Sequence, residues 1–181
     1  MRQRFLPILF LPTLLGCSKS DSNPEIFFGD GEGISYRTSN NMSVGPQDPT
    51  DWTSDATWSE RERNLFQELS FDLNGPQQPA AIAYTSVYSN PAQVSTANWT
   101  LQTQRNSGGG AADYTTRAVI VNRKYGALTK LGPNDFTLGQ QYSLDYARIG
   151  MQPNELYRLY YVVYTTSGLI YKGHGDIRYS R

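Results

Sequence analysis

The sequence is poor in the side chains that most enzymes use for metal binding and for nucleophilic catalysis. Its 181 residues include one cysteine, Cys17, and one histidine, His174. A single cysteine excludes an intramolecular disulfide. A single histidine excludes His-rich metal sites and any Ser-His-Asp triad built on another histidine. We therefore predict no catalytic residues, no metal and no cofactor.

Charge of one sign and long apolar runs are also lacking. The 16 Lys and Arg residues equal the 16 Asp and Glu residues, so the basic surface typical of nucleic-acid-binding proteins is not expected. The main apolar run, residues 5–15, would rise about 16 Å as a helix. A hydrocarbon core is about 30 Å thick, so we expect neither nucleic-acid binding nor a permanent transmembrane helix.

The first 17 residues have the pattern of a secretion signal. Arg2 and Arg4 precede the apolar run, and a basic head followed by a short apolar segment is typical of signal peptides. The run ends in Leu14-Leu15-Gly16-Cys17, which resembles the lipobox of bacterial lipoproteins. The resemblance implies cleavage between Gly16 and Cys17 and attachment of lipid, including palmitate, to Cys17. The alternative is an ordinary secretory signal followed by an incidental cysteine.

Lipidation at Cys17 would make the membrane the first predicted partner of this protein. Acylation removes the free thiol that would be a liability in a secreted chain, and several acyl chains together hold a protein permanently on a bilayer. Ser18 stands where some enteric lipoproteins carry the Asp that retains them in the inner membrane. We therefore expect a lipid-anchored protein of the bacterial cell envelope, in the outer membrane.

Three regions are expected along the chain. Residues 1–16 are the signal peptide, residues 17–50 form a lipidated N-terminus and flexible tether, and residues 51–181 form a single domain. The tether is predicted from its Ser, Asn, Asp, Gly and Pro content, which buries too little apolar surface to offset the entropy of ordering. Within it, Ile26-Phe27-Phe28 is expected to dock on the domain as a short edge strand.

One helix is predicted near residues 60–69. Ser59 and Glu62 have capping-box spacing, and Leu65, Phe66 and Leu69 form an apolar stripe. Asn74-Gly75-Pro76 is expected to stop it. A helix this short must pack on the rest of the domain.

The remainder is predicted to be mainly β, because 13 Tyr residues accompany 16 Gly and 10 Pro. The patterns favour an immunoglobulin-like β-sandwich of about seven strands, with a small β-barrel as the alternative. The strand near 156–166 carries apolar residues on both faces, which predicts cover on both sides and the helix over one. The expected strands are 81–88, 99–104, 115–123, 128–131, 142–146, 156–166 and 169–179.

A second resemblance lies at Tyr88-Ser89-Asn90-Pro91-Ala92, followed by Trp99-Thr100-Leu101. This stretch is similar to the β-sandwich sorting tails of Bacteroidota secreted proteins, which begin with an aromatic residue and Pro-Asn-Pro. Ser89 replaces the first proline. The resemblance implies a sandwich and a Bacteroidota-type envelope lipoprotein, not sorting by that route.

Two groups of residues are candidates for binding. His174 and Asp176 alternate with glycine and would share one face of a strand, as a metal pair or an acid–base pair; the alternative is structural pairing. Tyr157, Tyr161 and Trp99 could form an aromatic platform for a glycan; the alternative is core packing.

The function expected from the sequence is that of a non-enzymatic, lipid-anchored envelope protein. It would act as a structural module or through contacts with an unknown envelope protein. The alternatives are a surface glycan-binding module that uses Tyr and Trp side chains, and, third, an envelope hydrolase.

Overall fold

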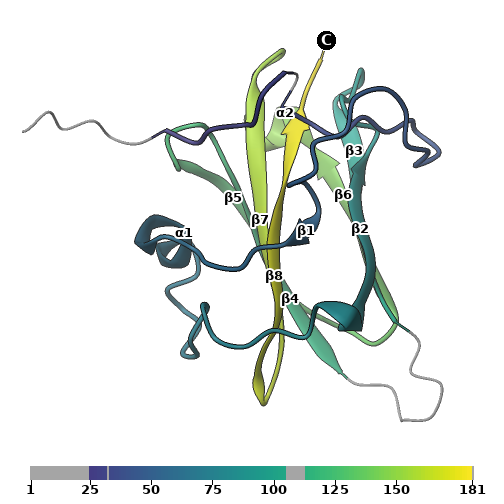
Figure 1. Cartoon of the computed structure of the whole chain (residues 1–181). Coiled ribbons are helices and arrows are strands. Elements are labelled where there is room, and N and C mark those ends of the chain that lie inside the picture. The colour runs from purple at the N-terminus through teal and green to yellow at the C-terminus, as the bar shows by residue number, and fades with distance from the viewer. Residues whose placement is uncertain (1–24, 32, 105–112, 181) are drawn as a thin grey trace, which may run out of the picture.

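The computed structural model describes residues 25–31, 33–104 and 113–180, and these form two packed layers of β-sheet (Figure 1). Two short helices accompany the strands, α1 (Glu60–Asn64) and α2 (Tyr146–Ile149), together with a 3₁₀ turn at Pro79–Ala81. The eight strands in the described residues are β1 Thr53–Ser54, β2 Ile82–Tyr88, β3 Thr96–Thr103, β4 Tyr114–Val121, β5 Ala127–Phe136, β6 Gly139–Asp145, β7 Leu156–Thr165 and β8 Gly168–Arg178.

The strands form two separate antiparallel sheets. One has the order β1-β8-β7-β4-β5 and the other the order β2-β3-β6. Strands β2, β3 and β6 thus face strands β4, β5, β7 and β8. An immunoglobulin-like sandwich has this arrangement when its fourth strand, here β5, joins the larger sheet. The predicted β-sandwich is confirmed. The barrel alternative is wrong, because the strands that the structure describes do not close on themselves.

The main core lies between the two sheets. Trp99 and Leu101 of β3 are fully buried there against Leu159 and Tyr161 of β7. Tyr142 of β6 stacks on Trp99 with ring centroids 4.8 Å apart. Alternation along each strand sends every second side chain into this layer.

A second core covers the outer face of the larger sheet. Tyr160 and Val162 of β7 point to this face and are fully buried beneath Trp58, Phe66 and residues from the N-terminal segment. The expectation that β7 is covered on both sides, with the helical segment over one of them, is confirmed.

The predicted capping box is present, but the helix is shorter than expected. The Ser59 hydroxyl accepts a hydrogen bond from the Glu62 amide, and the Glu62 side chain accepts one from the Ser59 amide. Helix α1 then ends at Asn64, and turns continue the chain past Phe66. The turns suffice because Phe66 stacks on Trp58 at 5.4 Å, so packing rather than helical hydrogen bonding places the apolar side chains.

The described part of the segment that we expected to be a tether belongs to the folded domain. Ile26, Phe28 and Ile34 are 1–3 % exposed. The Ile26 amide donates to the carbonyl of Arg123 at 2.8 Å. The expected docking of Ile26-Phe27-Phe28 is confirmed by the burial of Ile26 and Phe28, but these residues do not form the expected edge strand. Polar composition misled the rest of the tether prediction, because a few apolar side chains between turns are enough to dock a segment on an existing sheet.

The largest error in strand boundaries concerns β5. Its Gly132-Pro133-Asn134-Asp135 stretch has the composition of a turn, but β5 runs through it to Phe136. Proline is tolerated because β5 is an edge strand, where a missing N–H costs little. The pairing with β4 shifts register nearby, between Thr116 and Ala118. The two-residue β1 and the four-residue α2 were not expected, since such short elements leave no periodic pattern.

Candidate functional site

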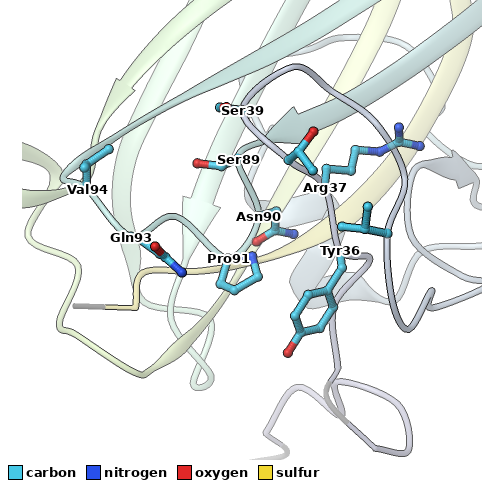
Figure 2. A pocket seen from close by; sticks show the side chains of 10 residues that line it. Tyr36, Arg37, Ser39, Ser89, Asn90, Pro91, Gln93 and Val94 are labelled. Carbon is cyan, nitrogen blue, oxygen red and sulfur yellow. The ribbon is translucent and has the colours of Figure 1, made fainter.

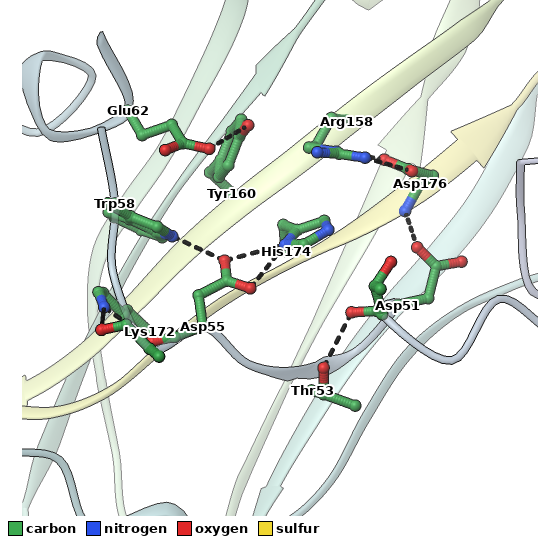
Figure 3. Close-up of polar contacts among 12 residues, drawn as sticks. Asp51, Thr53, Asp55, Trp58, Glu62, Arg158, Tyr160, Lys172, His174 and Asp176 are labelled. Carbon is green, nitrogen blue, oxygen red and sulfur yellow. Dashed lines mark hydrogen bonds and ion pairs between the residues drawn. The ribbon is translucent and has the colours of Figure 1, made fainter. Parts of the chain in front are cut away.

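The predicted pair His174 and Asp176 does share the outer face of β8, but each side chain has a different partner (Figure 3). His174 Nδ1 lies 2.9 Å from both carboxylate oxygens of Asp55, in the coil after β1. The same carboxylate accepts a 2.6 Å hydrogen bond from Trp58 Nε1. His174 thus ties the 52–58 segment to β8, which agrees with a structural role for this residue.

Asp176 forms a buried ion pair with Arg158 of β7. Arg158 Nε and Nη2 donate to the two carboxylate oxygens at 2.6 and 2.7 Å, and Asp176 is fully buried. Burial raises the pKa of the Asp176 carboxyl, and the two hydrogen bonds from Arg158 oppose that shift. Arg158 Nη2 also donates to the carbonyl of Phe27 at 3.0 Å, so this pair holds the N-terminal segment as well.

Asp51 is a buried acid that the sequence did not reveal. Its carboxylate accepts 2.7 Å hydrogen bonds from the amides of Ser35 and Asp176, and the residue is 6 % exposed. Burial, with the nearby charge of Asp176, raises the pKa of Asp51 from 3.8 to about 7. No sequence pattern marked it, because its two donors come from positions 16 and 125 residues away.

Lys172 completes a cluster of polar and charged residues beside β8, whose other members are Asp51, Asp55, Arg158, His174 and Asp176 (Figure 3). The residue is fully buried, its Nζ donates to the carbonyls of Asp55 and Ala56 at 2.7 and 2.8 Å, and it lies 5.5 Å from the centre of the Trp58 ring. Burial lowers the pKa of this ammonium group, while the Asp55 charge works in the opposite direction. Such a satisfied cation contributes to a fixed structure.

The cluster therefore joins chain segments, and its polar groups are largely used for that purpose. Among residues 25–31, 33–104 and 113–180, no three His, Cys, Asp or Glu side chains are placed to hold a metal ion. His174 and Asp176 do not contact each other as an acid–base pair would. What the arrangement does is fasten residues 27, 35 and 51–58 to β7 and β8.

The three aromatic residues proposed as a platform lie in the core instead of on the surface. Trp99 and Tyr161 are fully buried, and Tyr157 is 3 % exposed. Tyr157 presents only its hydroxyl toward the β6–β7 connection, where it accepts from the Gln152 amide at 2.7 Å. These three rings present no face on which a sugar could stack.

A cavity of about 420 Å³ lies between residues 36–44 and the β2–β3 loop (Figure 2). The stretch singled out in the sequence, Ser89-Asn90-Pro91, lines it. Asn90 is fully buried and donates to the carbonyls of Ser35 and Asp176 at 3.2 and 2.8 Å. At the rim, Val44 and Val94 are 42 % and 61 % exposed. Sequence reasoning missed this cavity because two segments about 50 residues apart enclose it.

The cavity offers shape and apolar surface more than reactive groups. The Arg37 guanidinium donates to the Asn41 carbonyl at 3.1 Å and lies 5.3 Å from the centre of the Tyr84 ring. The Tyr36 hydroxyl accepts from Arg178 at 2.6 Å. The charged groups around the cavity thus hold its walls together.

Comparison with protein-family models found none that matches this chain, and comparison with curated proteins found no match either. Within the described ranges, the helices are all too short or too polar to span a bilayer. Gly16 and Cys17, the predicted cleavage and lipidation site, lie outside the described residues.

Proposed function

We propose that this protein is a lipid-anchored, non-enzymatic protein of the bacterial cell envelope, which acts as a structural or protein-interaction module. The observation that carries the proposal is the sequence Leu14-Leu15-Gly16-Cys17 behind a basic and apolar leader. In the mature chain Cys17 would be the first residue, with its thiol carrying the lipid. Only seven residues, 18–24, separate it from Glu25, where the described domain begins.

The way the N-terminal segment is fastened supports an anchoring role. A domain held to a membrane by its N-terminus transmits any pull through the residues where the chain enters the fold. Here these residues are secured by the burial of Ile26 and Phe28, by the bond from Arg158 to the Phe27 carbonyl, and by the bond from the Ser35 amide to Asp51. The buried charges serve this attachment rather than an open reaction centre.

The first experiment replaces Cys17 with Ser in the full chain expressed in a bacterial host that processes lipoproteins. We expect wild-type protein to partition into detergent and to have the mass of an acylated chain beginning at Cys17. Cys17→Ser should remain an unprocessed and unacylated precursor. A double variant, Cys17→Ser with Ser22→Cys, keeps one thiol outside the motif and should also stay unacylated.

Ser20→Ala is the matched control, because it leaves the motif intact and should be processed like wild type. Mature wild-type protein that starts at another residue and carries no fatty acid would overturn the proposal. Density-gradient separation of the membranes then tests the expected location: the protein should follow outer-membrane markers, and recovery with inner-membrane markers would refute that part.

A further inference from the structure

We propose that one end of the sandwich, defined here as the apolar end by its exposed side chains Phe27, Met42, Val44 and Val94, lies directly on the bilayer. The partner surface is thus the lipid itself, in contact with the folded domain as well as with the anchor. This inference rests on the proposed lipid attachment at Cys17 and adds the orientation of the domain to it.

The distribution of exposed apolar side chains carries the inference. Five large apolar residues of the described chain are exposed: Phe27 at 72 %, Met42 at 60 %, Val44 at 42 %, Val94 at 61 % and Leu138 at 52 %. Single exposed apolar residues are common on any protein surface. Four of these five, however, lie at the same end of the sandwich, and only Leu138 lies at the other.

Backbone contacts define that end. The Ile26 amide bonds to the carbonyl of Arg123, in the turn after β4. Arg37 pairs with Asn90, and Ala92 pairs with Tyr179 after β8. These contacts bring the N-terminal segment, the β2–β3 loop and the end of β8 together, as the upper part of Figure 1 shows.

Leu138 lies at the far end of the same sheets. It follows Phe136, which pairs with Tyr114 at the start of β4, whereas Arg123 follows Val121 at the end of β4. At about 3.4 Å per residue, the length of β4 separates the two ends by roughly 24 Å. Leu138 therefore provides an internal comparison of similar chemistry.

The connection between Cys17 and the domain is short. Eight Cα-to-Cα steps lead from Cys17 to Glu25, and at about 3.3–3.6 Å each they reach at most about 29 Å. Glu25 enters the fold at the apolar end, since its neighbour Ile26 is bonded there. A lipid on Cys17 thus keeps this end at high effective concentration near the bilayer. Contact by the Leu138 end would instead require a nearly fully extended connection, which costs conformational entropy.

Phe27 has the orientation that such a contact requires. Ile26 and Phe28, on either side, are buried at 2 % and 3 %, so alternation points Phe27 outward. Arg123 and Lys124 are exposed nearby, but so are Glu25 and Glu155. Because the charges are of mixed sign, apolar insertion and not attraction to anionic lipid should dominate, as in shallow interfacial binding.

The test uses the full, lipidated protein in vesicles of phosphatidylcholine. Cys17 is the only native cysteine, and acylation blocks its thiol, so an introduced cysteine is the only reactive one. Phe27→Cys, Val94→Cys and Leu138→Cys each receive an environment-sensitive fluorophore. Quenching is then measured with lipids that carry a quencher on the acyl chain just below the headgroup, and separately with aqueous iodide.

We expect labels at positions 27 and 94 to be quenched by lipid several-fold more than the label at 138, and the order to reverse with iodide. Met42→Cys serves in place of either variant if one fails to fold. Equal lipid quenching at all positions overturns the inference. So does protection of position 27 from iodide without lipid quenching, which would indicate contact with protein.

Vesicle flotation of the same samples separates the two proposals. If the protein does not float and carries no acyl chains, the lipid anchor fails and the orientation falls with it. If the protein floats but the label at position 27 stays aqueous, the anchor stands and only the orientation is wrong.

Discussion

Arg158 and Asp176 lie directly opposite each other on β7 and β8 and are joined by two hydrogen bonds of 2.6 and 2.7 Å. The pair is almost completely removed from solvent, with Asp176 fully buried. It also links the sheet to the N-terminal segment, because Arg158 reaches the Phe27 carbonyl. Its main contribution is therefore to position that segment, since a buried ion pair adds little net stability over an apolar pair of similar volume.

Breaking this pair on one side should be strongly destabilising. Arg158→Met leaves the Asp176 carboxylate buried without its cation, and we expect a loss of about 3–5 kcal/mol in the free energy of unfolding, measured with urea. Adding Asp176→Asn should restore part of the loss. Glu68→Gln, which removes exposed pairs to Arg117 and Lys130, should cost less than about 1 kcal/mol. Equal costs for the two single variants would contradict the prediction.

Asp51 should make stability fall as pH rises. Its pKa is raised from 3.8 to about 7, so between these values the folded chain keeps a proton that the unfolded chain has released. The stabilisation is complete below pH 3.8 and is lost as pH rises through 7, at a slope of at most about 1.4 kcal/mol per pH unit. In Asp51→Asn this pH-dependent contribution disappears. The substitution itself changes the free energy of unfolding only by an amount that is the same at every pH.

The measurement is urea unfolding of wild type and Asp51→Asn at several pH values from about 4 to 8, compared as a difference at each pH. That difference isolates Asp51 from the other titrating groups. Asp135→Asn is the control, because Asp135 is exposed and accepts one hydrogen bond, from Thr115. A difference that is flat across this range, or that has the opposite sign, would rule out the raised pKa.

Asp55 should stabilise the attachment of residues 52–58 to β8. Asp55→Ala removes the acceptor of both His174 Nδ1 and Trp58 Nε1, and leaving such buried donors unpaired costs about 1–3 kcal/mol. The emission of Trp58 should also change, because its indole loses its hydrogen bond. Asp72→Ala, which removes a local bond to the Asn74 amide and a weaker charge interaction with Lys172, should cost less than about 1 kcal/mol. The assignment fails if the two variants are equally stable.

Gly175 should tolerate no side chain. Its position on β8 lies directly under the Trp52 indole, where a Cβ atom would clash with the ring. Gly175→Ala should cost about 1–3 kcal/mol through overpacking and should shift the Trp52 indole resonance in an NMR spectrum. Adding Trp52→Ala should remove that cost.

Gly150→Ala is the comparison for Gly175. At Gly150, φ is +90° and a Cβ atom would meet no other atom within 4 Å, so only backbone strain of about 1–2 kcal/mol is expected. This variant should leave the Trp52 resonance in place. If Gly175→Ala leaves it in place as well, the proposed packing is incorrect.

Much of the fold could be predicted because its signals are local. The Ser59–Glu62 capping box has a fixed spacing, and the apolar residues on both faces of β7 predicted cover on both sides; both features are present. Pro133 shows the limit of local reasoning. A proline would end a central strand but is accepted in an edge strand. Only the order of the strands in the sheet decides that β5 is an edge strand.

The candidate site was harder to predict. The spacing of His174 and Asp176 correctly placed both on one face, but spacing carries no information about their partners, Asp55 and Arg158. Trp99 and Tyr161 are residue types that form binding platforms, but both are buried in the core. Aromatic rings suit both settings, and only burial distinguishes them.

The amino-acid sequence alone determined the mainly β character, the predicted lipid attachment at Cys17 and the exclusion of an intramolecular disulfide. Alternation, a contiguous motif and a single cysteine are properties of the chain itself. Tertiary structure alone decided that Asp51 is buried beside Asp176, that residues from Glu25 onward join the domain, and that Phe27 and Val94 share an end. These depend on segments far apart in the chain packing together, and desolvation and contact arise only once they do.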